Sequence, residues 1–247
     1  MMKQIKFLVI VAALMVCSIA SAQFTRSSRS GSSSLNTDGW QSIFIMYSPT
    51  TLSTSITQKN VKKQSLDSNL TGLTFGYNKA FSVSKNIPLF VKVGGELKYS
   101  YGKENEEIDR VKCDVKYSFF SVKVPTSVVY DISIANNIDI LPYAGVYFRY
   151  NISHKEKLTL NDDYYYYDSS EKYEMDLFDK INRFQVGWHI GADVMFNRKF
   201  YAGVGYSSDI TKFCDDDYNY NDDGYDYISY HYKADSHAIN ITLGFVF

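Results

Sequence analysis

The chain has 247 residues, of which 45% are apolar, 16% aromatic and 21% charged, and its formal net charge at pH 7 is -1. Such a chain is long enough to bury a core but short for two full domains, and its balanced charge excludes both a nucleic-acid binder that relies on a strong basic field and a highly charged disordered chain. Tyrosine is abundant (22) beside only 4 prolines, and this composition favours β-structure.

The first 22 residues have the three-part layout of a Sec-type export signal. Lys3 and Lys6 supply a positive start, and residues 7–16 are almost wholly apolar. Residues 20–22, Ala-Ser-Ala, give the small-x-small pattern that precedes a signal-peptidase cut. The apolar run is about half of the ~20 residues that a membrane-spanning helix needs. We therefore expect a leader that is cleaved after residue 22.

Residues 23–39 are rich in Ser and Arg, and we expect them to form a flexible periplasmic tail. A lipoprotein acylated at Cys17 is an alternative, although Val16 stands where such signals prefer a small residue. The mature chain keeps Cys113 and Cys214, whose spacing fits no disulfide framework, so their pairing stays open. The chain has no CxxC motif and no Cys/His cluster, and we expect neither a structural zinc site nor a cofactor.

Between residues 40 and 247, alternation of apolar with small or polar side chains predicts eight strands. The pattern is clearest in the last strand, where Ile241 and Leu243 alternate with Asn240 and Thr242. The predicted strands are residues 40–48, 70–81, 89–101, 115–132, 138–152, 182–196, 200–209 and 237–247.

The connections between these strands are alternately short and long. The short ones contain Asn or Ser, which favour turns, and lie at 84–86, 135–137 and 197–199. The long ones lie at about 49–65, 102–112, 153–179 and 213–236. This layout predicts an all-β fold, an eight-stranded antiparallel up-and-down transmembrane β-barrel of outer-membrane type with its long loops outside the cell.

The polar face of the strands mixes charges of both signs with glycines and small residues, which suits a narrow barrel interior. Because side chains fill the lumen of an eight-stranded barrel, we expect a salt-bridged plug, with a pore as the alternative. The expected network in the lumen comprises Lys92, Glu96, Lys98, Lys123, Arg149, Arg183, His189 and Asp193. On the apolar face, tyrosines near strand ends are expected at the membrane boundary: Tyr47, Tyr77, Tyr99, Tyr101, Tyr130 and Tyr150.

Three stretches resemble the outer-membrane β-barrel family common in Bacteroidetes, which includes PorT-like and opacity-type small barrels. They are FSVKVP at 120–125 with LPYAG at 141–145, the segment from NRF at 182–184 to FYAGVGY at 200–206, and LGFVF at 243–247. The likeness covers about residues 40–247 and implies an integral protein of the bacterial outer membrane, in contact with its lipid. The last stretch also resembles the signal read by the outer-membrane assembly machinery, through Ile241, Leu243, Phe245 and Phe247.

Two of the predicted loops are dense in Asp and Tyr. Tyrosine offers rigid amphipathic contact area, so these loops are candidates for binding an extracellular protein or glycan. The candidate residues are Tyr164, Tyr165, Tyr166, Tyr167, Tyr218, Tyr220, Tyr225 and Tyr227. Calcium binding is an alternative, because Asn219, Asn221 and Asp223-Gly224 have the spacing of the start of a calcium loop, but Tyr230 stands where a bidentate Glu belongs. We expect no metal site, and purely solvated loops are the third interpretation.

An enzyme is a weaker interpretation of the same barrel. Asp235, Ser236 and His237, with His231 close by, could belong to a lipid-A-directed hydrolase. Sequence neighbours on alternating faces rarely converge on one substrate, so we expect no catalysis. The sequence thus predicts a structural or surface-interaction role, with a PorT-like accessory barrel for protein secretion as the alternative.

Overall fold

The computed structural model of the protein describes residues 39–58, 64–108, 111–162, 170–176, 182–222 and 225–247. Regular structure in these ranges consists of strands. They are β1 (Trp40–Gln58), β2 (Gln64–Ser82), β3 (Leu89–Ile108), β4 (Val111–Tyr130), β5 (Ile132–Ala135), β6 (Ile138–Asp162), β7 (Ser170–Asp176), β8 (Phe184–Phe196), β9 (Phe200–Asp209), β10 (Cys214–Asp222) and β11 (Tyr225–Val246). The described part of the chain contains no helix that is long and apolar enough to cross a membrane.

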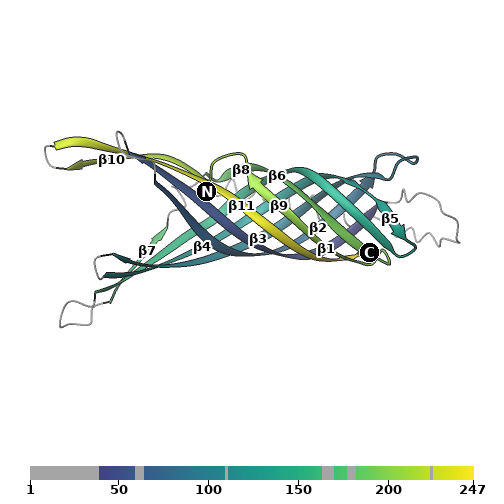
Figure 1. Ribbon diagram of the computed structural model, residues 1–247, viewed down its shortest axis with the longest axis horizontal. Helices are drawn as coiled ribbons and strands as arrows, with labels where there is room; N and C mark the ends of the chain where they lie inside the picture. Colours follow the sequence, from purple (N-terminus) through teal and green to yellow (C-terminus); the bar gives the residue numbers. More distant parts are fainter. Residues whose placement is uncertain (1–38, 59–63, 109–110, 163–169, 177–181, 223–224) are drawn as a thin grey trace, which may run out of the picture. The chain divides into compact units, whose positions relative to one another are not determined.

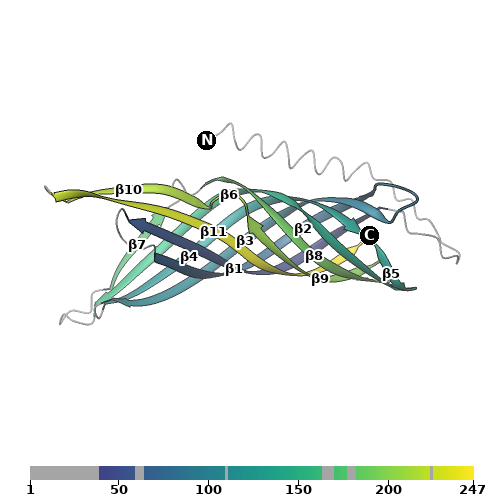
Figure 2. The same ribbon diagram turned by 45° about the horizontal axis from the view of Figure 1, so that its top comes forward.

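Eight of the strands form a closed antiparallel barrel (Figures 1 and 2). They follow one another in the order β1-β2-β3-β4-β6-β8-β9-β11, and β11 closes the ring by pairing with β1 from Ser42↔Val246 to Gln58↔Tyr230. The other three strands lie outside the ring, since β5 and β7 pair with β6 and β10 pairs with β11. The predicted eight-stranded up-and-down barrel is therefore confirmed.

The barrel has two different ends. At the turn end, the short connections 83–88, 131–137 and 197–199 lie with the start of β1 and the end of β11. At the hairpin end, the strands run far beyond the predicted limits, and β3 stays paired with β4 out to Ile108↔Val111. The prediction of long irregular loops is wrong for most of these stretches. Tyr and Thr, which occur in these stretches, favour strands, whereas apolar alternation marks only the part of a strand that lies in apolar surroundings.

The strand extensions form two separate sheets, because pairing between β2 and β3 stops at Leu70↔Gly102. The first prong consists of residues 50–58, 64–69, 214–222 and 225–236, in the order β2-β1-β11-β10. The second prong consists of residues 103–108, 111–118, 153–162 and 170–176, in the order β3-β4-β6-β7. Figure 1 shows both prongs at the same end of the barrel, with β10 in one and β7 in the other.

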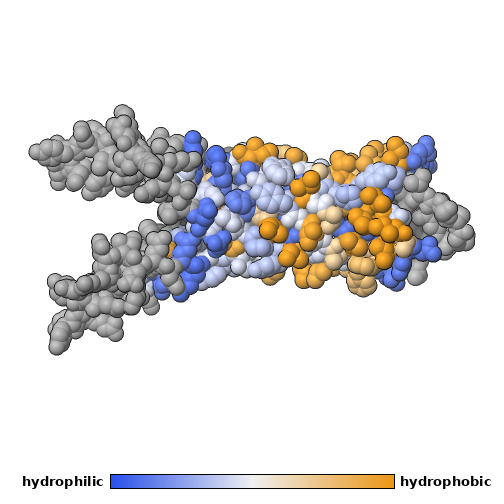
Figure 3. All heavy atoms as spheres, in the orientation of Figure 1, coloured by the Kyte–Doolittle hydropathy of each residue, from blue (hydrophilic) through white to orange (hydrophobic). Residues whose placement is uncertain are grey.

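The outward face of the wall is an apolar belt. Large apolar side chains are exposed on every barrel strand, including Phe75 at 55% and Leu243 at 57%. Figure 3 shows this belt in orange toward the turn end and hydrophilic residues at the base of the prongs. Past Tyr101, the exposed side chains at register-paired positions of β3, β4 and β6 are charged: Lys103, Lys116 and Lys157. An apolar band that ends in aromatic and then charged residues matches the profile of a bilayer.

The inward face is filled, and it is not polar throughout. The turn-end cluster seals one side of the lumen and consists of Phe44, Ala80, Phe90, Val129, Leu141, Met195, Tyr201 and Val246. The hairpin-end cluster lies at the other side and consists of Leu70, Phe119, Phe213 and Ala234. The prediction of a polar inward face is therefore incomplete. Phe90 and Phe119 occupy that face and are 0% and 8% exposed, because the two ends of the lumen are packed with apolar side chains.

The turn end also corrects the predicted strand 115–132. β4 stops at Tyr130, and Asp131 turns the chain before β5, whose residues are all exposed and pair only with β6. The two-residue turn Asn197-Arg198 has φ values of 50° and 55°, which suits a tight hairpin. Arg198 forms ion pairs with Asp131 at 3.5 Å and Asp139 at 3.3 Å. These ion pairs connect the β8–β9 turn to the neighbouring β4–β6 connection.

Candidate functional site

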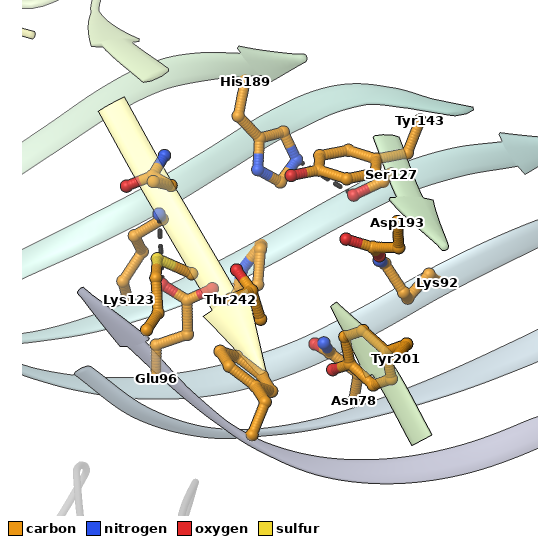
Figure 4. Close-up of a pocket in the computed structure, with 14 residues that line it drawn as sticks. Asn78, Lys92, Glu96, Lys123, Ser127, Tyr143, His189, Asp193, Tyr201 and Thr242 are labelled. Atoms are coloured by element: carbon orange, nitrogen blue, oxygen red, sulfur yellow. Dashed lines mark hydrogen bonds and ion pairs between the residues drawn. The ribbon is translucent and has the colours of Figure 1, made fainter. Parts of the chain in front are cut away.

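Between the two apolar clusters the lumen holds a polar layer built from ion pairs. Lys92 Nζ lies 3.1 Å from Asp193 Oδ2, and Lys123 Nζ lies 3.0 Å from Glu96 Oε2 (Figure 4). Both ammonium groups also lie over tyrosine rings, Lys92 at 4.5 Å from the centroid of Tyr143 and Lys123 at 4.4 Å from that of Tyr147. The carboxylate and aromatic partners compensate part of the free-energy cost of removing these lysines from water.

A third ion pair joins Arg149 of β6 to Asp209 of β9, two residues that are nearly completely buried. Gln185 Oε1 accepts hydrogen bonds from Arg149 Nε (2.9 Å) and Asn151 Nδ2 (2.9 Å). The Tyr147 hydroxyl donates to Asp209 Oδ1 at 2.6 Å. The network is nearly saturated, which is the condition under which buried charges are tolerated.

The structure brings together five of the eight residues predicted for the lumen network, namely the pairs Lys92–Asp193 and Lys123–Glu96 and, in the third pair, Arg149. Lys98 donates to Thr50 Oγ1 at 3.0 Å. His189 hydrogen-bonds Ser127 Oγ at 2.9 Å instead of Asp193. Arg183 precedes β8, and its carbonyl oxygen accepts from the Asn151 amide at 2.8 Å.

The sequence interpretation missed Asp209, Gln185 and Tyr147 as members of this network. All three lie on the polar face of strands that were correctly located. Asp209 is the last residue of β9, and its side chain is fully buried beside Arg149. The alternation could have found these residues, but it could not have told which charges meet.

The described lumen contains small cavities. One of about 30 Å³ is lined by Lys92, Glu96, Tyr143 and His189 among others, a second of about 10 Å³ lies nearer the hairpin end, and a third of about 30 Å³ is lined by Lys98, Leu70 and Phe119 among others. Each has room for one or two water molecules. Together with the two apolar clusters, these volumes describe a plugged barrel and not an aqueous channel.

The residues considered for hydrolysis do not converge. Ser236 is 7% exposed and lines the lumen, whereas His237 is next to it on the outward face and stacks on Tyr206, with ring centroids 6.5 Å apart. Asp235 is paired with Lys212 at 2.5 Å, and His231 is paired by register with Thr57 of β1. This arrangement gives Ser236 no His or carboxylate partner among the described residues.

The structure describes only one of the two sets of tyrosines that were predicted to lie in loops. Tyr164, Tyr165, Tyr166 and Tyr167 lie outside the described residues. The other four lie on strands of the first prong: Tyr218 and Tyr220 on β10, and Tyr225 and Tyr227 on β11.

The segment considered for calcium is mostly strand. Asn219 pairs with Ser229, and β10 continues in extended form to Asp222. A calcium loop instead curves its oxygen ligands around one ion. No group of three potential metal-ligating side chains occurs among the described residues.

The residues predicted as an assembly signal share the outward face of β11. Ile241, Leu243, Phe245 and Phe247 are 47%, 57%, 41% and 47% exposed, and they stand in line on the strand that closes the barrel. The two mature cysteines lie in different prongs, Cys113 on β4 paired with Leu160 and Cys214 on β10 paired with Ala234.

A protein-family model described as "Outer membrane protein beta-barrel domain" matches residues 50–215. No curated protein matches the sequence. Among solved structures, the chain is similar to Ail, the attachment invasion locus protein of Yersinia pestis in complex with the heparin analogue sucrose octasulfate, with 16% identity over 82% of this chain and 99% of that chain and a TM-score of 0.29. It is also similar to the outer membrane protein OprG from Pseudomonas aeruginosa (12% identity, 83% and 95% covered, TM-score 0.39) and to the outer membrane enzyme PagL (11% identity, 76% and 97% covered, TM-score 0.34).

Proposed function

The chain belongs to the outer membrane protein β-barrel family and is thus an integral protein of the bacterial outer membrane, and on this basis we propose that it is a non-enzymatic surface protein whose prongs bind an extracellular protein or glycan. Export by a Sec signal at residues 1–22, a periplasmic tail at 23–39 and insertion by the outer-membrane assembly machinery belong to the same proposal.

The observation that supports this function is the pair of prongs with open edges. Within the described residues, β10 pairs only with β11, and β7 pairs only with β6. Each outer strand therefore offers a row of backbone donors and acceptors to an incoming strand. A barrel that served only as a membrane anchor would need strands no longer than the bilayer is thick, yet β6 has 25 residues where about 10 suffice.

The orientation follows from the same architecture. Outer-membrane barrels place short turns in the periplasm and long extensions outside the cell. The start of β1 lies at the turn end, where a periplasmic tail would join the barrel. In this orientation the parts of β10 and β11 that carry Tyr218, Tyr220, Tyr225 and Tyr227 lie outside the cell, where tyrosine would supply rigid contact surface for a ligand.

The packing of the lumen is evidence against transport, and the positions of Ser236 and His237 are evidence against hydrolysis. Two apolar clusters enclose the ion pairs, so a solute has no continuous path through the described lumen. Ser236 and His237 lie on opposite faces of β11, so a Ser-His pair does not form. Both observations leave the prongs as the part of the molecule available for function.

The test compares the mature protein in lipid nanodiscs with a variant in which residues 215–232 are replaced by a short turn. Arrays of extracellular proteins and of glycans measure binding, and the heat-dependent shift in gel mobility checks that the barrel has closed. We expect the full protein to retain a ligand that the shortened variant loses. Equal binding by a shortened variant with an intact barrel would contradict a role for the first prong.

A PorT-like accessory role in protein secretion is the second candidate. The open edges of the prongs are also suited to docking another subunit of a secretion machine, because strand addition does not depend on the identity of the partner. Deleting the gene and measuring the exported proteins separates the two functions. Loss of a secretion factor makes other proteins accumulate in the periplasm, whereas loss of a ligand-binding protein leaves export unchanged.

A further inference from the structure

We propose that the lumen binds one small monovalent anion of the halide class, chloride under ordinary conditions, beside Lys98. The proposal concerns the polar layer of the barrel and is independent of any ligand on the prongs.

The first argument is the charge balance of the lumen. Three cations of the polar layer each have a carboxylate partner, in the pairs Lys92–Asp193, Lys123–Glu96 and Arg149–Asp209. Lys98 is the fourth, and within the described residues no carboxylate lies within 4.0 Å of its ammonium group, which donates only to the neutral Thr50 hydroxyl. A cation enclosed in a barrel requires a counter-charge, and the carboxylates that act on Lys98 among the described residues, Glu96 and Asp209, are already paired with Lys123 and Arg149.

Lys98 lines two cavities of the lumen, and the second argument is the smaller one, which Thr74 also lines. Its volume is about 10 Å³, which corresponds to one small particle. It is lined by three cations, Lys98, Lys123 and Arg149, and by hydroxyl and amide groups of Ser48, Thr74, Ser207, Ser236 and Asn240. None of the described residues that line it is a carboxylate. Cations and hydroxyl donors without a competing anion make a site that selects negative charge.

The third argument is a buried hydroxyl without a partner. Thr74 is 1% exposed and lines the same cavity, and its Oγ1 has no hydrogen-bond partner among the described residues. By contrast, Ser48 donates to Asn240 Oδ1 at 2.9 Å, and Asn240 Nδ2 donates to Ser207 Oγ at 3.1 Å. Buried hydroxyls in native proteins are nearly always satisfied. An anion in the cavity would accept the Thr74 proton and complete the set.

The sequence makes room for this arrangement at Gly72. A Cβ at that position would lie 2.7 Å from Lys98 Cε and 2.9 Å from the Ser48 carbonyl oxygen. Only glycine therefore allows the lysine stem to cross β2 and reach Thr50 on β1. A volume of about 10 Å³ is at the lower limit for one water-sized particle, so sulfate or phosphate, with four oxygens, does not fit, and the cavity is left to a single-atom anion.

The experiment measures unfolding of the mature protein in lipid vesicles by urea, with sodium chloride replaced stepwise by sodium gluconate at constant ionic strength. One bound ion predicts that the unfolding equilibrium constant falls tenfold for each tenfold rise in chloride above its dissociation constant. Bromide should act like chloride, and sulfate like gluconate. A constant that does not change with halide would overturn the proposal and assign the cavity to water.

Two variants locate the effect. Lys98→Met keeps the stem and removes the charge, and Thr74→Val keeps the shape and removes the hydroxyl. We expect the first to abolish the halide dependence and the second to raise the halide dissociation constant at least tenfold, while Lys85→Met, at an exposed position in the β2–β3 turn, leaves it unchanged. If Lys98→Met fails to fold, an anomalous bromide peak next to Lys98 in crystals of the unaltered protein decides the question. A halide dependence that survives Lys98→Met, or bromide peaks only on the outer surface, would refute the site.

Discussion

The two faces of the same strands are held by different kinds of interaction. On β11, Ile241 and Leu243 face outward, where any apolar side chain of similar size would contact lipid equally well. Between them, Thr242 and the neighbouring Asn240 face the lumen, and Asn240 bonds to both Ser48 and Ser207. The outward face therefore requires a residue type, whereas the lumen requires particular partners.

Ion pairs show the same contrast. Arg149–Asp209 in the lumen has side chains that are 9% and 0% exposed, whereas Lys212–Asp235 near the rim has side chains that are 39% and 43% exposed. Exposed pairs gain little because water screens them, while buried pairs are costly to break because the remaining charge has no solvent. Substitutions on the two faces of the wall and in the two ion pairs test these differences, and the expected losses decrease from Asp209→Ala to Lys212→Ala.

Asp209→Ala should produce the largest loss. It leaves the Arg149 guanidinium buried and takes the acceptor from the Tyr147 hydroxyl, so we expect a cost of about 4 kcal/mol in the free energy of unfolding. Urea titration in lipid vesicles, followed by tryptophan fluorescence, measures it. The double variant Arg149→Met/Asp209→Leu removes both charges and should recover more than half of the loss. A double variant as unstable as the single one would show that shape, and not charge, dominates this site.

Phe90→Ala should cost about 3 kcal/mol, because it opens a cavity in the turn-end cluster, where Phe90 packs edge-on against Trp40 with ring centroids 4.7 Å apart. The matched control is Phe75→Ala on the outward face, where lipid replaces the lost contacts and the loss should be less than half as large. Equal losses from both variants would contradict the distinction between packed lumen and fluid belt.

Leu243→Arg places a charge in the apolar belt and should cost about 2–3 kcal/mol near the bilayer midplane. Tyr47→Arg, on β1 at the hairpin-side limit of the belt, should cost about 1 kcal/mol or less, because the guanidinium reaches the interface. Refolding into vesicles of known thickness measures both. A reversed order would mean that the belt has been placed at the wrong height.

The sequence predicts the faces well and the partners poorly. A strand has a period of two, so alternation assigns Leu97 to the outside and Glu96 to the inside without knowledge of the fold. It does not state that Glu96 meets Lys123, or that Lys92 meets Asp193 at a separation of 101 residues. Those pairs depend on the tilt and stagger with which the barrel closes, and these are properties of all eight strands together.

The alternation also does not indicate how far along the barrel axis a residue lies. Phe90 and Lys92 share one face of β3, yet one belongs to an apolar seal and the other to an ion pair. The strand limits fail for a related reason. Beyond the belt, Lys103 and Lys116 pair directly across β3 and β4 in a ladder whose β3 side, residues 103–107, has no apolar residue to mark it. The prongs, which carry the proposed function, were therefore the part least accessible to sequence.

Lys212→Ala should have the smallest effect, about 0.5 kcal/mol or less, although its ion pair has a shorter N–O distance than Lys92–Asp193 has in the lumen. Length alone does not set the strength of an ion pair, because water around Lys212 and Asp235 takes over their solvation once they separate. The loss should vanish as salt rises from 0.05 M to about 1 M, where the Debye length falls to ~3 Å. The Asp209→Ala loss should persist over the same range, since the lumenal pair is shielded from salt. If both losses fell in parallel with salt, the lumen would be wet, and the contrast between the two faces would not hold for charge.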